Sequence, residues 1–487
     1  MILDWIEAAA SRHGEDVYLA DARGSATLTY AGLRASVRAT ARLLDTAWVP
    51  PGGRIAVRIA DPLDYATAMV SIIATGRVAV PLDPGAPDAD IARVLSVARP
   101  AAMITTWNRA VATDTRTAGS GAATHPFWII DLALNCAPPA DSGGIFLSTS
   151  GTTGAPKGIL LRAEQLAHVA SSVVDSHRLT SSDRGYCSLP LFHVNAEVVG
   201  VLATLRAGAY LAVDRKFSRR GFWDIITERQ ITWINAVPAI ISILILDPPA
   251  SRPATLRFVR SASAPLPLAS LEAFEATIGV PVVETYGMTE AASMITANPV
   301  DGVRKPGSTG RPAGTEVRVL AADGTVAVSG VIGKVQIRGA GVIRAYASGG
   351  RPGAIDDDGW LNTGDLGYLD ADGYLFLAGR SDDVINRGGE KIYPREIEEV
   401  LLAQPGVRSA AVVGIPDDVL GERPVAYVVA SSEAVPDDVD ATLRAACATL
   451  LPKPKQPSEF RLVAELPLGA TGKISRRLLR ELVTTQS

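Results

Sequence analysis

Residues 144–162 read GIFLSTSGTTGAPKGILLR, so a loop of hydroxyl side chains, glycines and one lysine joins two apolar, strand-like runs. Glycines let backbone N–H groups approach phosphate oxygens, hydroxyl groups add directional donors, and Lys157 supplies a mobile positive charge. A Walker A loop ends in Lys-Ser or Lys-Thr, whereas Lys157 is followed by Gly158. The stretch therefore predicts a polyphosphate-binding loop of another kind, for which a simple flexible turn is the alternative.

Strand-like and helix-like segments alternate before this loop. RIAVRIA, VAVPLDP and AAMIT are apolar runs typical of strands, and DYATAMVSIIATG and ADIARVLSVARP are typical of helices. This alternation predicts βα units and a largely parallel sheet covered by helices, which is an α/β fold. The small, polar segment TRTAGSGAATHP, residues 115–126, is expected to be a surface loop.

The chain changes character after the loop, from about Gly330 onward. Short strands punctuated by glycine, GKVQIRGAGVI and GYLDADGYLFLAGR, predict hairpins and a smaller β-rich layer. Beyond a boundary near residue 380, KIYPREIEEVLLAQPGV predicts a helix that begins at Pro394, followed by the strand SAAVVGIP and the helix DATLRAACATLLP. The C-terminal part is therefore expected to be a small α+β unit.

Length and composition narrow the class of protein. A chain of 487 residues exceeds what one core usually organises, so two or more domains are expected. A net charge of −4 without a long basic run argues against a nucleic-acid partner. Three scattered cysteines fit a reducing compartment, and apolar stretches such as AIISILIL are too short for a bilayer, which needs about 20 residues. A cytoplasmic enzyme without a membrane partner is expected.

The loop at 148–158 resembles the diagnostic loop of the adenylate-forming superfamily, which includes acyl-CoA synthetases, the adenylation domains of nonribosomal peptide synthetases, and luciferases. Five further motifs follow in the order of that family. They are ETYGMTE (284–290), LNTGDLGY (361–368), GRSDD (379–383), NRGGEKIYP (386–394) and LPLGATGKISRRLLREL (466–482). The resemblance implies a large N-terminal domain, residues 1–379, of two βα sheets plus a distorted β-barrel. A hinge at 380–383 and a small mobile α+β lid, residues 384–487, complete the expected fold.

The resemblance implies ATP and Mg²⁺ as cofactors and assigns residues to them. Thr289 is expected to face the phosphates, Glu290 to hold the metal, and Tyr286 to stack on adenine next to Gly287. Asp365, which alone would be a turn-former in a tight turn, accepts hydrogen bonds from the ribose hydroxyls in this family. Besides Lys157, the remaining nucleotide-binding positions are Thr149, Ser150, Gly151, Thr152, Thr153, Gly154, Arg380 and the hinge residue Asp382.

The same resemblance names a catalytic lysine and an acceptor loop. Lys473 matches the lysine that stabilises negative charge at the reacting carboxylate and α-phosphate, although Gly469 stands where the family usually has threonine. Alone, Lys473 would be a surface lysine ahead of a basic helix. The segment with Gly388, Gly389, Glu390 and Lys391 is expected to contact the thiol of the acceptor, for which coenzyme A is the first choice.

Local sequence also indicates the acid. PLFHVN, residues 190–195, carries His193 as acyl-CoA synthetases do, and Asn235 replaces the carboxylate with which peptide synthetases hold an amino group. WINAVPA, RFVRSASAPLP and INRGGEKI resemble oxalate-CoA ligases and other short-acid ligases, but Ser293 stands where those have histidine. The expected pocket walls suit a small or aromatic acid. These walls are His193, Asn195, Val237, Ser261, Ser263, Gly287 and Ser293. His193 is also expected to act in catalysis.

The expected activity is ATP-dependent activation of a carboxylic acid as its acyl-adenylate, followed by transfer to a thiol. Several alternatives remain open at this stage: a carrier-protein phosphopantetheine, an amine, or nitrite as in an ATP-dependent diazotase. A non-catalytic nucleotide-binding homologue is the alternative from another class. The sequence does not separate a monomer from a homodimer.

Overall fold

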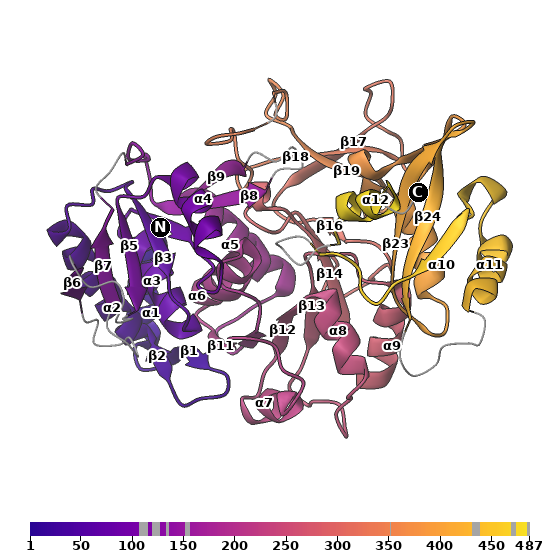
Figure 1. Cartoon of the computed structure of the whole chain (residues 1–487). Coiled ribbons are helices and arrows are strands. Elements are labelled where there is room, and N and C mark those ends of the chain that lie inside the picture. The colour runs from indigo at the N-terminus through magenta and orange to yellow at the C-terminus, as the bar shows by residue number, and fades with distance from the viewer. Residues whose placement is uncertain are drawn as a thin grey trace.

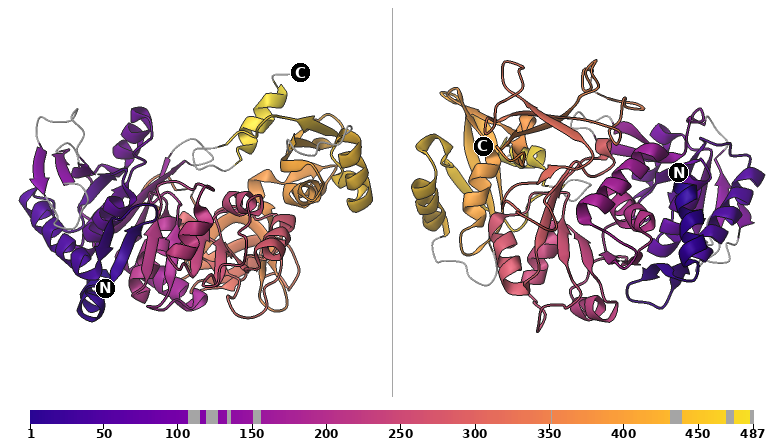
Figure 2. Two further views of the ribbon diagram at one scale, coloured as in Figure 1. Left: turned by 90° about the horizontal axis from the view of Figure 1, so that it is seen from below. Right: turned by 180° about the vertical axis from the view of Figure 1, so that it is seen from behind.

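The computed structural model describes residues 1–106, 115–118, 127–132, 136–150, 156–350, 352–430, 439–468 and 474–484. Two large sheets and the helices packed on them form the N-terminal part, and the C-terminal α+β unit stands at the opposite end of the molecule (Figures 1 and 2). The fold is α/β, as the alternation of strand-like and helix-like segments predicts.

The first sheet has seven strands in the order β6-β7-β5-β3-β4-β8-β9. Its central strands run parallel, and β9 returns antiparallel to β8, so that Thr149 pairs with Lys157 at the base of the predicted phosphate loop. Residues 115–118 form the edge strand β6 against β7, which corrects the expectation of a loop there. The strands are β3 (Arg54–Arg58), β4 (Val78–Pro81), β5 (Ala102–Thr106), β6 (Thr115–Ala118), β7 (Phe127–Asp131), β8 (Gly144–Ser150) and β9 (Pro156–Arg162).

The second sheet has nine strands in the order β16-β15-β14-β13-β12-β10-β11-β1-β2. The strands from β14 to β1 run parallel, so the carboxyl ends of β10, β12, β13 and β14 share one edge. The strands are β1 (Val17–Asp21), β2 (Thr27–Thr29), β10 (Arg184–Cys187), β11 (Tyr210–Val213), β12 (Trp233–Ala236), β13 (Phe258–Ser261), β14 (Val282–Tyr286), β15 (Thr296–Ala297) and β16 (Arg311–Pro312).

A layer of helices lies between these sheets and shares one apolar core with both. Asp61 caps α3, where its carboxylate accepts hydrogen bonds from the backbone N–H groups of Leu63 and Asp64. The helix is buried on nearly all sides, because it packs between other elements instead of facing water. The helices of this part are α1 (Ile2–His13), α2 (Tyr30–Thr46), α3 (Pro62–Ala74), α4 (Asp88–Ala98), α5 (Ala163–His177), the π-helix η1 (Asn195–Leu202), α6 (Ala203–Ala207), α7 (Phe222–Glu228), α8 (Pro238–Ile245) and α9 (Leu268–Ile278).

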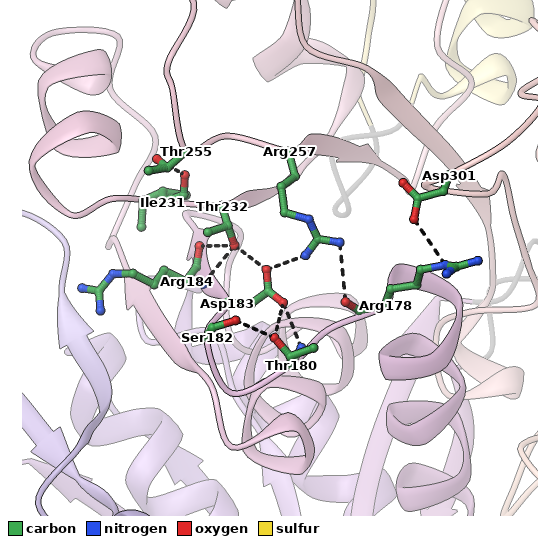
Figure 3. Close-up of polar contacts among 10 residues, drawn as sticks. All are labelled: Arg178, Thr180, Ser182, Asp183, Arg184, Ile231, Thr232, Thr255, Arg257 and Asp301. Carbon is green, nitrogen blue, oxygen red and sulfur yellow. Dashed lines mark hydrogen bonds and ion pairs between the residues drawn. The ribbon is translucent and has the colours of Figure 1, made fainter.

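A hydrogen-bonded cluster lies at the amino-terminal ends of β10, β12 and β13 in the nine-stranded sheet (Figure 3). Asp183, just before β10, accepts hydrogen bonds from Thr180, from the Thr232 hydroxyl at 2.7 Å, and from the Arg257 guanidinium. Arg257 also donates to the backbone oxygen of Arg178 at 3.5 Å. A carboxylate therefore neutralises the cation at this edge, and the cluster ties three strand starts together.

The expected distorted barrel takes the form of a four-stranded antiparallel sheet, β17-β18-β19-β20. Backbone hydrogen bonds join Leu375 to Thr309 and Gly310, so β20 also links to the segment ahead of β16. The first of these strands begins at Glu316, earlier in the chain than the change of sequence character at Gly330 predicts. The strands are β17 (Glu316–Leu320), β18 (Gly333–Arg338), β19 (Leu361–Leu369) and β20 (Leu375–Arg380).

The C-terminal unit is a five-stranded sheet with helices on both faces. In β23, alternate side chains enter two separate cores, one under α10 and α11 and one under α12, which explains the continuous apolar run SAAVVGI. Helix α10 begins at Pro394, as predicted. The elements are β21 (Ile385–Arg387), β22 (Glu390–Ile392), α10 (Pro394–Leu402), β23 (Val407–Asp417), β24 (Gly421–Ala430), α11 (Val439–Leu450), β25 (Glu459–Leu462) and α12 (Arg476–Thr484). Among the described helices of the whole chain, none has the length and apolar character to cross a membrane.

Candidate functional site

The predicted acid-pocket residues follow the carboxyl ends of neighbouring parallel strands. Val237 comes directly after β12, Ser261 ends β13, and Gly287 comes directly after β14. In open α/β sheets, ligands bind in the crevice outside the carboxyl ends of the strands. This edge therefore has the topology of a ligand site.

A hydrogen-bonded group at this edge contains a buried cation. The Arg260 guanidinium donates from one nitrogen to the side-chain oxygens of Asn195 and Asn235, each at 2.9 Å. Asn195 in turn donates to the Ser263 hydroxyl at 3.2 Å. Burial lowers the pKa of Arg260 to about 9, so the side chain stays protonated at neutral pH. Sequence reasoning missed Arg260, although a charged residue inside the apolar run RFVRS was a signal.

The turn after β14 is packed too tightly for a side chain at Gly287. A Cβ atom there would lie 1.3 Å from the backbone oxygen of Ser293. Ala292 and Ser293 have positive φ angles of 48° and 100°, a region that glycine occupies more readily than other residues. The short helix η2 (Thr289–Ala291) lies inside this turn, which fixes the positions of Thr289 and Glu290.

One hydrogen-bonded group joins the end of β14 to the four-stranded sheet. It consists of Tyr286, Asp365 and Arg380. The Tyr286 hydroxyl donates to Asp365, and the Arg380 guanidinium binds the other oxygen of that carboxylate at 2.9 Å. Burial and the Asp365 charge raise the pKa of Tyr286, which stays a neutral donor. Asp365 lies within strand β19, paired with Arg380, and not in a tight turn; the glycine before it, at a φ of 76°, supplies the backbone freedom that resembled a turn signal.

Lys157 and Glu290 meet at Tyr346, a residue that sequence reasoning did not single out. The Tyr346 hydroxyl donates to Glu290 at 3.0 Å, and the Lys157 ammonium lies 5.3 Å from the centre of the Tyr346 ring. Backbone hydrogen bonds between residues 158 and 347–348 hold this segment against β9. Two motifs that are far apart in sequence are thereby placed side by side by a third segment. No pattern in the sequence pointed to Tyr346.

The predicted hinge and acceptor loop lie where the chain leaves one sheet for another. Strand β20 ends at Arg380, a single helical turn covers Ser381–Asp383, and β21 begins the C-terminal sheet. Gly388 and Gly389, with φ of 56° and 88°, form the two-residue turn between β21 and β22, as a type I′ hairpin requires. Glu390 and Lys391 are exposed in β22. Rotation about this hinge stays a prediction.

Several predicted residues are placed only in part. Gly151, Thr152, Thr153, Gly154 and Lys473 lie outside the described residues. Thr149 and Ser150 are described only as backbone of β8. His193 is half-buried, and its ring lies 4.8 Å from that of Phe192, next to the first turn of η1.

The donor set fits a nucleotide with a divalent cation. Among the described residues, no group of three or more His, Cys, Asp or Glu side chains could hold a metal ion. A hard cation held by Glu290 would therefore take its other ligands from phosphate oxygens and water, as Mg²⁺ does in nucleotide sites. Lys157 lies close enough to Tyr346, the partner of Glu290, to place a positive charge at the same end of the site.

The comparisons with known proteins all point to one family. The AMP-binding enzyme family matches residues 6–347, and the AMP-binding enzyme C-terminal domain matches residues 396–473. The chain is 46% identical over 358 residues to the sulfoacetate–CoA ligase of Cupriavidus necator, which covers 73% of this chain and 69% of that protein. It is 34% identical over 485 residues to the oxalate–CoA ligase of Arabidopsis thaliana, which covers 94% of both.

Solved structures agree with the sequence comparisons. The crystal structure of ATP-bound MatB from Rhodopseudomonas palustris superposes with a TM-score of 0.86, at 27% identity and over 99% of both chains. The match extends over both the N-terminal part and the C-terminal unit. With the phosphate-loop hairpin, the Asp365 group and the Glu290 turn in family order, the chain belongs to the AMP-binding enzymes, the adenylate-forming ligases.

Proposed function

We propose that this protein is an AMP-forming acid–thiol ligase that activates a small carboxylic acid with ATP and transfers it to coenzyme A. The observation that carries the proposal is the meeting of two groups at one site. Lys157 and Glu290 gather around Tyr346, and Asp365 and Arg380 gather around Tyr286. Both groups lie beside the carboxyl edge that holds the predicted acid pocket. The family relationship and the CoA ligases among the relatives support the same activity.

In the first half-reaction, an oxygen of the substrate carboxylate attacks the α-phosphorus of ATP. A bond forms between that oxygen and phosphorus, the bond to the bridging oxygen breaks, and pyrophosphate leaves. Residues 148–158, Lys157 and Glu290 hold the leaving group in this proposal, and Asp365 fixes the ribose. The contribution of these residues is orientation and charge stabilisation, to which Lys473 adds a further positive charge.

In the second half-reaction, the thiol sulfur attacks the acyl carbon of the mixed anhydride and loses its proton. A thioester forms, the acyl–oxygen bond breaks, and AMP leaves. We assign the Gly388–Gly389 turn to the acceptor channel, because its exposed glycines leave room for a narrow pantetheine arm. Access of the thiol requires withdrawal of Lys473, for which Asp382 is the proposed hinge.

The pocket residues favour a small acid. Asn195, Ser261, Ser263 and Ser293 are short and polar, and Gly287 cannot be enlarged without moving the Ser293 backbone. Two relatives, a sulfoacetate–CoA ligase and an oxalate–CoA ligase, are named for acids of this size. A reducing cytoplasm stays the proposed location, and a monomer or a homodimer the proposed state.

The decisive experiment offers the enzyme ATP, Mg²⁺, hydroxylamine and a panel of acids, and detects acyl hydroxamate and AMP. The best acids are then repeated with coenzyme A, and the product mass is determined. A thioester of coenzyme A supports the proposal. AMP and hydroxamate without a thioester would redirect it to a carrier-protein, amine or nitrite acceptor. Absence of any ATP-dependent product, despite nucleotide binding, would indicate a non-catalytic homologue.

A further inference from the structure

Arg260 is a buried cation without an anionic partner among the described residues. Its side chain is 1% exposed, and no ion pair between described residues includes it. Its Nε atom is buried and has no hydrogen-bond partner within the described parts of the chain. Arg257, three residues earlier on the same chain segment, is by contrast neutralised by Asp183 at the amino-terminal edge (Figure 3). A buried charge is costly unless an anion compensates it, so the burial of the Arg260 charge needs an explanation.

The hydrogen bonds around Arg260 set the direction of their neighbours. Arginine only donates, so Asn195 and Asn235 must turn their side-chain oxygens towards it. The NH₂ group of Asn195 then points away from Arg260 and donates to the Ser263 hydroxyl at 3.2 Å. Because that hydroxyl oxygen is occupied as an acceptor, its proton is left to donate outward. The chain from Arg260 to Ser263 therefore presents a hydrogen-bond donor that is backed by a positive charge.

This donor chain ends at the predicted acid pocket. Asn195 opens η1, and Ser263 lies two residues beyond the carboxyl end of β13, with an exposed side chain and a φ of 74°. The Ser261 hydroxyl is also buried without a partner. Carboxylates and sulfonates only accept hydrogen bonds, so they are the complement of such a wall.

We infer that Arg260, acting through Asn195 and Ser263, makes the enzyme select acids that carry a second anionic group besides the carboxylate that is adenylated. The second group is a carboxylate or a sulfonate, and it binds at the Ser263 end of this donor chain. Arg260 is a positioning residue that does not touch the substrate. The inference rests on the proposed function and narrows its substrate class.

The test compares pairs of acids that are similar in size and differ in the second charge. Sulfoacetate, oxalate and malonate form the dianionic set, and acetate, glycolate and propionate form the monoanionic set. Adenylation is followed as hydroxamate formation, and kcat/KM is measured for each acid. The wild-type enzyme is expected to prefer the dianionic set at least tenfold. Preference for sulfoacetate over malonate, or the reverse, identifies the second group.

Two variants test the donor chain without removing a buried cation. Asn195→Asp places a carboxylate against Arg260 and neutralises it, and Ser263→Ala deletes the terminal donor on an exposed loop. Both are expected to lower, at least tenfold, the ratio of kcat/KM for dianionic acids to kcat/KM for monoanionic acids. The change should come mainly from a higher KM for the dianionic acids. Arg257→Lys, which keeps its charge beside Asp183 at the opposite edge, is the control and should leave the ratio unchanged. Arg260→Lys should retain more of the preference than Arg260→Met.

The outcomes separate this inference from the proposed function. A wild-type enzyme that adenylates monoanionic acids equally well or better overturns the inference and leaves the ligase activity intact. The same follows if Asn195→Asp and Ser263→Ala bind ATP normally and keep the wild-type ratio within twofold. If no acid of either set is adenylated, the inference fails, and the proposed function fails only if the wider acid panel also gives no ATP-dependent product.

Discussion

Glu197 shows how a single buried group makes stability depend on pH. It lies in η1, where one carboxyl oxygen accepts a hydrogen bond from the Tyr65 hydroxyl at 2.8 Å and the other has no partner. Burial raises its pKa from 4.5 to about 8, which the Tyr65 hydrogen bond opposes only in part. The folded protein therefore holds the proton more tightly than the unfolded chain does. This stabilisation is complete below about pH 4.5 and is lost as the pH rises through about 8.

Glu197→Gln is expected to remove this pH dependence. Each pKa unit corresponds to about 1.4 kcal/mol, so the variant should gain on the wild type by roughly that amount per pH unit between pH 6 and pH 8. Thermal unfolding midpoints at pH 6, 7, 8 and 9 measure the effect, with the exposed Glu272→Gln on α9 as the control. Parallel pH profiles for Glu197→Gln and the wild type would contradict the assignment.

Gly287→Ala is expected to displace the turn that carries Thr289 and Glu290. The added Cβ would lie 1.3 Å from the Ser293 oxygen, and Ala292 and Ser293 already have positive φ angles. ATP binding, measured by titration calorimetry, should weaken at least tenfold, and the unfolding midpoint should fall. Gly85→Ala is the control, because a Cβ there meets its nearest neighbour at 3.5 Å, an ordinary contact. Equal ATP affinity in both variants would show that the turn adapts.

The residues of the candidate site could be predicted from the sequence where a family motif contains them. The sequence indicated Lys157, Glu290 and Asp365 before any geometry was available, although their roles stay proposals. Tyr346 and Arg260 were not predicted, because each acts through a tertiary contact. Tyr346 joins two motifs, and Arg260 matters because Asn195, 65 residues away in sequence, folds back onto it.

At the scale of elements, ion pairs tie the C-terminal helix α12 to the rest of its unit. Arg476 donates to both oxygens of Glu398 on α10, at 2.6 and 2.9 Å, and also contacts Asp383. Arg480 reaches the same Asp383 at 3.2 Å. These contacts connect the predicted hinge with the helix that follows Lys473.

Arg476→Leu is expected to loosen α12. The change leaves the largely buried Glu398 carboxylate without its partner, which costs about 1–3 kcal/mol. Arg477→Leu is the matched control, because Arg477 is 71% exposed and pairs with Glu481 one turn away, a contact worth about 0.3–0.5 kcal/mol. Urea unfolding followed by fluorescence, together with the rate of acyl-adenylate formation, should separate the two variants. Equal effects would mean that the Glu398 pair is not structurally important.

Element types were easier to predict than pairings. Pro394 at the first helical position fixed the start of α10, and alternate burial on two faces was implicit in the apolar run of β23. Residues 115–118 and Asp365 were assigned to a loop and a turn. Both lie in strands, because pairing with β7 and β20 outweighs local preference for turns.

At the scale of the whole molecule, two parts of the chain must cooperate on one substrate. The C-terminal unit touches the N-terminal part through Arg395, which donates to the Leu377 oxygen at 3.0 Å, and through Glu399, which accepts from the Leu268 N–H at 3.3 Å. Both contacts are polar, which suits a unit that changes position. Sequence motifs predicted the two units; the contacts between them could not be predicted, since they depend on the arrangement of both.

Lys473→Ala is expected to separate the two half-reactions. Exchange of labelled pyrophosphate into ATP should fall at least about a hundredfold, the usual effect of removing a transition-state charge partner. Thioester formation from supplied acyl-adenylate and coenzyme A should stay within a few-fold of wild type. Lys334→Ala, at an exposed position in β18, serves as the control. Equal loss of both half-reactions would contradict the assignment of Lys473 to the adenylation step alone.

The placement of Arg260 on a strand has a consequence for altering the enzyme. Its charge is held by a sheet interior that tolerates little mutation, whereas Ser263 sits on an exposed loop with an unusual backbone. Varying the exposed residues 264 and 265, with Ser263 retained, is therefore a way to change the length and shape of the acids accepted. The requirement for a second negative charge should persist in such a library, because Arg260, Asn195 and Ser263 are all kept.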